Sequence, residues 1–114
     1  MRYARRGGFG TLVLAALLAS SCSSNPETQK EKHVERGDQY VAEKRDEFAV
    51  VEYASAVQID PKFGEAHFKL AQTYEGMGNL RSAFAEYIRA ADAMPPNREA
   101  ELKAINLLLR AGQF

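Results

Sequence analysis

Two consecutive segments of equal length, residues 30–63 and residues 64–97, repeat one another along the chain without a gap. When they are aligned, eight positions are identical. The identical pairs are Glu31 and Glu65, His33 and His67, Tyr40 and Tyr74, Ala49 and Ala83, Glu52 and Glu86, Tyr53 and Tyr87, Ala56 and Ala90, and Pro61 and Pro95. A unit this short cannot bury its apolar face alone, so such units stack on their neighbours. The repeat therefore predicts a solenoid.

Each unit has the pattern of two helices joined by a turn. In residues 64–97, apolar or small side chains recur every three or four positions along both halves, which is the spacing of one helix face. Gly76 and Gly78 bracket the turn, and Asn79 is placed to cap the following helix through its side-chain oxygen. Pro95 stops the second helix, as Pro61 does in the first unit. The predicted fold class is all-α.

The joint pattern resembles the tetratricopeptide repeat (TPR). This family requires small residues at places eight, twenty and twenty-seven, and aromatic residues at places eleven and twenty-four. The small places hold Gly37, Ala49 and Ala56 in unit one, and Ala71, Ala83 and Ala90 in unit two; the aromatic places hold Tyr40, Tyr53, Tyr74 and Tyr87. The resemblance implies two full TPR units, 30–63 and 64–97.

Two departures from the family pattern lead to local expectations. His33 and His67 occupy place four, where the family often has Trp, and we expect each ring to fill that semi-buried aromatic position rather than to bind a metal. Unit one has Lys44 and Arg45 where the turn glycine would stand, so we expect its turn to be less regular.

Residues 98–114 align with the first helix of a third unit and the start of its turn. Ile105, Leu108 and Leu109 would then lack a partner helix, although Leu102 and Ile105 could cover the open edge of unit two. Two interpretations stay open: a piece of a longer array, or a short protein whose last helix acts as a cap.

Residues 1–21 have the zones of an export signal. Arg2, Arg5 and Arg6 precede an apolar run at residues 11–19, which is too short to cross a bilayer because a spanning helix needs roughly 20 apolar residues. Small residues then lead into Cys22, the single cysteine of the chain. This resembles the lipobox of bacterial lipoproteins, and the resemblance implies cleavage before Cys22 and its lipidation. The alternative is a type I signal cleaved near Ala19.

The resemblance to bacterial lipoproteins also implies a location. Residues 22–29 are small and polar and suit a lipidated cysteine with a flexible tether. Ser23 follows the cysteine, where an aspartate would favour inner-membrane retention. We therefore expect a lipid anchor in the cell envelope, on the periplasmic face of the outer membrane if the host is Gram-negative.

Charge and motif content limit the function classes. The chain has 15 basic and 15 acidic residues, and without the three arginines of the signal 12 basic residues face 15 acidic ones. A mildly acidic body argues against nucleic-acid binding. The sequence has no catalytic constellation, phosphate loop or metal motif, and we interpret acids such as Glu52 and Glu86 as solvated faces. We expect no enzyme activity, no cofactor, no metal and no small-molecule substrate.

The resemblance implies a binding groove along the first helix of each unit. Places two, five, nine and twelve of that helix point into it in the TPR family. These are Glu31, Val34, Asp38 and Val41 in unit one, Glu65, Phe68, Gln72 and Glu75 in unit two, and Glu99, Leu102 and Asn106 in the third. Such a groove is acidic with an apolar strip, so it favours a basic or apolar protein segment. The alternative is that these acids only solubilise the surface.

Three functions agree with these features. The first is a lipid-anchored interaction module that scaffolds a cell-envelope assembly, such as polysaccharide export or pilus and secretion biogenesis. The second is a pilotin-like outer-membrane lipoprotein. The third is the docking arm of a larger enzyme that continues beyond Phe114.

Overall fold

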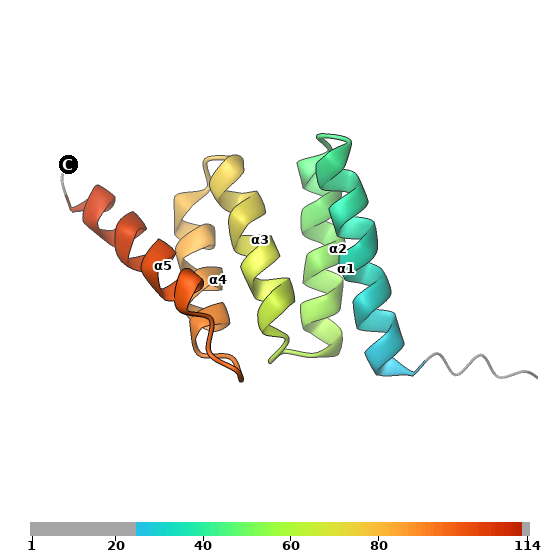
Figure 1. The fold of residues 1–114 in the computed structure, drawn as a ribbon. Helices are drawn as coiled ribbons and strands as arrows, with labels where there is room; N and C mark the ends of the chain where they lie inside the picture. The colour runs from blue at the N-terminus through green and yellow to red at the C-terminus, as the bar shows by residue number, and fades with distance from the viewer. Residues whose placement is uncertain (1–24, 113–114) are drawn as a thin grey trace, which may run out of the picture.

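The computed structural model describes residues 25–112 (Figure 1). They form five helices, α1 (Pro26–Ala42), α2 (Asp46–Ile59), α3 (Gly64–Gly76), α4 (Leu80–Ala91) and α5 (Arg98–Ala111). Each helix packs on the one before it along the row. The all-α solenoid of two helical pairs followed by the first helix of a third is confirmed. The predicted signal segment and Cys22 lie outside the described residues.

Helix α1 begins inside the segment predicted to be a flexible tether. Asn25 caps it by accepting a hydrogen bond from the Glu27 backbone N–H at 3.1 Å, and Pro26 occupies the first turn, where its missing N–H costs nothing. The Lys30 amine then reaches Asp60, beyond the end of α2, at 2.7 Å. The prediction of a tether over residues 22–29 was therefore wrong for residues 26–29, because local capping extends the helix backward.

The two inter-helix turns are built alike. Backbone N–H groups of residues 43, 44 and 45 bond to the carbonyls of 39, 41 and 40, and residues 77, 78 and 79 repeat these bonds to 73, 75 and 74. Gly78 has φ +80° and Lys44 has φ +59° at the equivalent place. The expectation of a less regular first turn was wrong, because Lys44 adopts the left-handed conformation that glycine adopts in the second.

This conformation predicts a stabilising substitution. The left-handed region costs a non-glycine residue about 1 kcal/mol, so Lys44→Gly should raise the free energy of unfolding by about 0.5 kcal/mol after the added flexibility of the unfolded chain is subtracted. Urea denaturation followed by circular dichroism measures the change. Lys62→Gly, in another loop, is a control that should not stabilise the chain. A Lys44→Gly variant less stable than the parent would contradict this account of the turn.

The core consists of two clusters that follow the repeat. The small places Ala49 and Ala56 are buried in the first cluster, and Ala71, Ala83 and Ala90 are buried in the second. Tyr53 and Tyr87 are the large side chains of these clusters, at 2% and 0% exposed. Small residues let the paired helices approach closely around each tyrosine ring.

Helix α5 covers the open side of α4 with a different face from the expected one. Ala100, Ala104 and Leu107 are buried there, whereas Leu102 and Ile105 are 65% and 47% exposed. The expectation that Leu102 and Ile105 cover unit two was therefore wrong, because Ala100, Ala104 and Leu107 pack against unit two instead. No helix within residues 25–112 is long and apolar enough to span a membrane.

Candidate functional site

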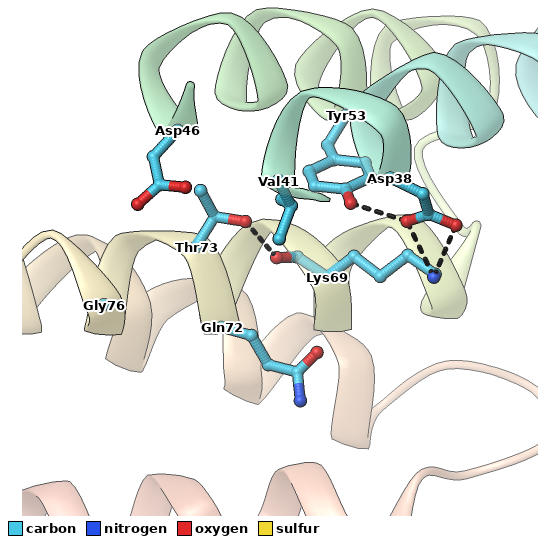
Figure 2. Close-up of a pocket in the computed structure, with 8 residues that line it drawn as sticks. All are labelled: Asp38, Val41, Asp46, Tyr53, Lys69, Gln72, Thr73 and Gly76. Carbon is cyan, nitrogen blue, oxygen red and sulfur yellow. Dashed lines mark hydrogen bonds and ion pairs between the residues drawn. The ribbon is translucent and has the colours of Figure 1, made fainter. Parts of the chain in front are cut away.

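A cavity of about 340 Å³ lies between α1 and α3, beside the first inter-helix turn (Figure 2). Asp38 and Val41 line it from α1, and Lys69, Gln72, Thr73 and Gly76 line it from α3. Asp46 and Tyr53 contribute from α2. The cavity therefore joins the first helices of both units, and we call it the α1–α3 groove.

The inner wall of this groove is fixed by a tyrosine. The hydroxyl of Tyr53 donates to the Asp38 carboxylate at 2.6 Å, and the Lys69 amine donates to both oxygens of the same carboxylate at 2.8 and 2.9 Å. Burial of the ring and the hydrogen bond to Asp38 raise the pKa of Tyr53. Asp38 is thus held in place from α2 and α3 at once, which fixes the spacing of the groove walls.

Unit two repeats this tyrosine–carboxylate bond with a different acid. The Tyr87 hydroxyl donates to Glu75 at 2.6 Å, and burial together with this bond raises the pKa of Tyr87. Tyr53 and Tyr87 are equivalent in the repeat, but Asp38 stands at place nine and Glu75 at place twelve. One acid at either place satisfies the hydroxyl, because both lie on the helix face that meets the ring.

The groove is less acidic than the sequence predicts. Lys69 neutralises Asp38 and lies 4.0 Å from Glu65, and Glu75 is engaged by Tyr87. The side chains of Asp46 and Gln72 line the cavity and form no hydrogen bond or ion pair with another side chain between residues 25 and 112. The available charge of the groove is therefore that of Asp46 beside the Asp38–Lys69 pair.

A second cavity of about 440 Å³ lies at the other end of α3. Glu65 and Phe68 line it from α3, and Phe63 and Lys30 lie beside them. The Lys30 ammonium group sits 4.6 Å from the centre of the Phe63 ring, a cation–π contact. The apolar strip predicted at Phe68 is thus extended by Phe63, which the repeat pattern did not indicate.

The predicted groove residues do not all meet at one place. Asp38, Val41 and Gln72 line the first cavity, Glu65 and Phe68 line the second, and Glu75 is half-buried beneath Tyr87. Glu31, Glu99, Leu102 and Asn106 are exposed outside both cavities. Val34 is wrong as a groove residue: it is 5% exposed and packs in the first core cluster with Ala49, Tyr53 and Leu70.

The two repeated histidines lie in the helix-pair interfaces. His67 is 2% exposed; its Nδ1 lies 2.6 Å from the Glu86 carboxylate and its Nε2 lies 2.7 Å from the Pro61 carbonyl. The Nδ1 of His33 lies 2.7 Å from Glu52, but this pair is more exposed. The interpretation of Glu52 and Glu86 as solvated faces was therefore wrong, because each carboxylate is turned inward to a histidine.

The geometry of His67 requires a charged ring. Carboxylate and carbonyl oxygens only accept hydrogen bonds, so both ring nitrogens must donate, which needs the imidazolium form. Burial lowers the pKa of His67, but the hydrogen bonds to Glu86 and Pro61 outweigh it, and the pKa is raised above 6.5. Within residues 25–112, no three side chains of the metal-binding types come together.

This raised pKa predicts that stability depends on pH. The contribution of His67 to stability is fully present below pH 6.5, the value in the unfolded chain, and is lost as the pH rises through the folded-state value. The free energy of unfolding should therefore fall as the pH rises above 6.5. The His67→Gln variant should lose most of this slope. A His67 ring that titrates below pH 6.5 by NMR would contradict the assignment.

The comparison with protein families decides the identity of the repeat. The family model described as TPR repeat matches residues 37–78. The chain therefore carries TPR repeat sequence over these residues. The match runs from Gly37 in α1 to the turn glycine Gly78, so it includes the α1–α3 groove. No curated protein matches the chain. TPR repeats generally mediate protein–protein interactions, so the chain carries an interaction module.

The repeat pattern did not indicate Lys69 and Asp46 as groove residues. Lys69 stands one place beyond Phe68 on α3, outside the four groove places, and reaches Asp38 because its side chain is long. Asp46 begins α2 and reaches the groove across the turn. A signal for the tyrosine–acid bonds was present, since each unit carries one acid among places nine and twelve.

Proposed function

We propose that this TPR protein is a lipid-anchored adapter that holds a protein partner in a bacterial cell-envelope assembly. The partner segment binds in the α1–α3 groove, and the anchor is a diacylglyceryl group on Cys22. Polysaccharide export and pilus or secretion biogenesis are the assemblies of this kind that we favour. The location is the periplasmic face of the outer membrane where the host has one.

The groove carries this proposal. Val41 is 41% exposed at its rim, and the carboxylate of Asp46 and the amide of Gln72 are unpaired among residues 25–112. Exposed apolar surface beside polar groups that are free to bond a ligand is typical of a binding site. Two lining acids against the single base Lys69 leave one negative charge in excess. A segment with an apolar side chain and a nearby Lys or Arg fits this surface, and charge complementarity supplies the specificity.

The anchor is supported by the order of the zones within residues 1–29. An arginine-bearing start, an apolar run and small residues precede Cys22 in the order that an exported lipoprotein needs. Two acyl chains hold a protein on a bilayer stably, whereas a single chain binds reversibly. Because α1 begins at Pro26, only a short segment separates it from Cys22, which would keep the repeats close to the bilayer surface.

The TPR module acts by binding and not by catalysis. His67 and Tyr87 line neither the α1–α3 groove nor the cavity beside Phe68, and the Tyr53 hydroxyl in the groove is bonded to Asp38. The carboxylates of Glu52 and Glu86 are likewise held by histidines. These observations support a role of the groove in recognition.

The experiment compares two aspartate substitutions in the full-length chain, purified from detergent extracts of bacterial membranes. Val41→Asp places a charge in the groove, and Val51→Asp places one on the exposed surface of α2, where Val51 is 62% exposed. We expect the parent and Val51→Asp to recover the same envelope protein, and Val41→Asp to recover at least about tenfold less, as loss of a hot-spot contact does. Equal recovery by both variants, or no envelope protein at all, would refute the groove.

The anchor is tested separately with Cys22→Ser. This variant should keep its uncleaved size and carry no lipid, whereas the parent should be processed, lipidated and membrane-bound. A Cys22→Ser chain that stays membrane-bound and is processed normally would refute lipidation without bearing on the groove.

A further inference from the structure

The outer face of α5 carries four large apolar side chains that the rest of residues 25–112 leaves exposed. Leu102, Ile105, Leu108 and Leu109 are between 47% and 65% exposed there. Beside them, a cavity of about 260 Å³ runs between α4 and α5 and is lined by Leu80, Phe84, Leu107, Leu108, Ala111 and the stem of Arg81. Monomeric proteins rarely expose contiguous apolar patches unless they bind something.

The repeat shows what kind of element covers such a face. A shift by one repeat unit relates Leu102, Ile105 and Leu108 to Phe68, Ala71 and Tyr74 of α3. Those three residues belong to or pack against the second core cluster, which includes Ala83, Tyr87 and Ala90 of α4. The equivalent face of α5 is therefore shaped for an antiparallel α-helix.

The side chains of α5 differ from those of α3, and this difference determines which kind of helix can pack on the exposed face of α5. Ala71 allows the close approach of α4, but Ile105 holds the equivalent place and keeps a neighbour further away. Leu102, Ile105 and Leu109 are spaced three and four residues apart, which is the seam of a coiled coil. The seam is nearly symmetric about the midpoint between Ile105 and Asn106. An antiparallel copy therefore sets Leu102 opposite Leu109 of the second copy.

The charges at the two ends of α5 favour the same pairing. Its first turn carries Arg98 with Glu99 and Glu101, a net charge of one negative, and its last turn carries Arg110. In an antiparallel pair the acidic turn of one helix lies beside the basic turn of the other, and the helix dipoles also oppose one another. A parallel pair would bring like charges together. We propose that two copies of this chain associate through an antiparallel pair of α5 helices.

This association is independent of the partner groove. None of the lining residues of the α1–α3 groove lies on α5, so both surfaces can be occupied at once. A dimer would present two grooves on one membrane, and two linked weak sites hold a bivalent partner more tightly than either alone.

The test is photo-crosslinking of the full-length chain in bacterial membranes. A benzophenone amino acid replaces Leu109, which is 63% exposed, or, as a matched control, Val51, which is 62% exposed on α2. We expect an adduct of twice the chain mass from position 109 and at least about tenfold less from position 51. Adding Ile105→Asp to the position-109 chain should abolish the adduct, while circular dichroism remains that of the parent.

A charge exchange distinguishes specific pairing from adhesion of apolar surfaces. Arg110→Glu should reduce the adduct several-fold, and the triple change Glu99→Arg, Glu101→Arg and Arg110→Glu should restore it. The proposal is overturned if position 109 gives no adduct, if its adduct contains a different protein, or if position 51 reacts equally. It is also overturned if the triple change restores nothing. The Val41→Asp groove variant should dimerise like the parent, so the two proposals fail separately.

Discussion

The Tyr87→Ala variant should lose about 4 kcal/mol of its free energy of unfolding, because truncating a fully buried aromatic side chain typically costs 3–5 kcal/mol, here taken as about 4. Tyr87 is 0% exposed and is the largest fully buried side chain of the described residues. Its ring meets Phe68 edge-on at 5.7 Å and fills the space that the surrounding alanines leave. Those alanines cannot collapse into the vacated volume.

Urea denaturation followed by far-ultraviolet circular dichroism measures this loss. A small domain has about 5–15 kcal/mol of stability in total, so the variant should be close to unfolding at 37 °C. Tyr87→Phe is the control: it keeps the ring and removes only the hydrogen bond to half-buried Glu75, at a cost of about 1 kcal/mol. A Tyr87→Ala variant that loses no more than Tyr87→Phe would mean that the ring is not a core element.

A valine at Gly37 should destabilise the chain by about 3 kcal/mol through overpacking. A Cβ atom at this position would overlap the Tyr53 ring, with Cδ1 at 2.7 Å and Cζ at 2.8 Å. The ring cannot move aside, because it is 2% exposed and its hydroxyl is bonded to Asp38. The close approach of α1 and α2 thus depends on the absence of a side chain at place eight.

Gly76→Val is the matched control for this substitution. Gly76 ends α3, is exposed, and has no atom within 4 Å of an added Cβ, so this change should alter stability by less than about 0.5 kcal/mol. Chemical denaturation of both variants under one set of conditions gives the difference. If Gly37→Val were as stable as Gly76→Val, the close approach of α1 and α2 at Tyr53 would be refuted.

The repeat register explains why so much of the fold could be predicted from the sequence. The places of Gly37, Ala49 and Tyr53 hold residues of similar size in both units, because two helices meet at a similar distance in each unit. Such a constraint is visible in residue size alone. Asn79 was likewise predictable as a cap, and its side chain accepts the Ser82 backbone N–H at 3.3 Å. The periodicity of the sequence thus reflects packing contacts that both units share.

Features that occur once could not be predicted in this way. Lys44 adopts a glycine conformation because its turn is held by three backbone hydrogen bonds, and that constraint outweighs the preference of the residue. Asn25 starts α1 early through a cap that belongs to no repeat. Both effects depend on hydrogen bonds that residue size does not reveal.

The candidate site was only partly predictable for a related reason. Groove places follow from helix geometry, so Asp38, Val41 and Gln72 were found. Their charge state depends on reach across helices: Lys69 crosses from α3 to neutralise Asp38. Val34 lies at a groove place but is short enough to be covered by the core. A long side chain such as Lys69 therefore reaches the groove from outside the groove places, whereas a short one such as Val34 is buried although it stands at a groove place.

Photo-crosslinking from Gln72 in the full-length chain, in its own membranes, tests the central claim that the α1–α3 groove is the partner-binding surface. Gln58 on α2 is the matched control, since both are exposed glutamines and Gln58 lines neither the groove nor the cavity beside Phe68. The account predicts an envelope-protein adduct from position 72 that Val41→Asp removes, and none from position 58. Equal adducts from both positions, or none from position 72, would contradict it.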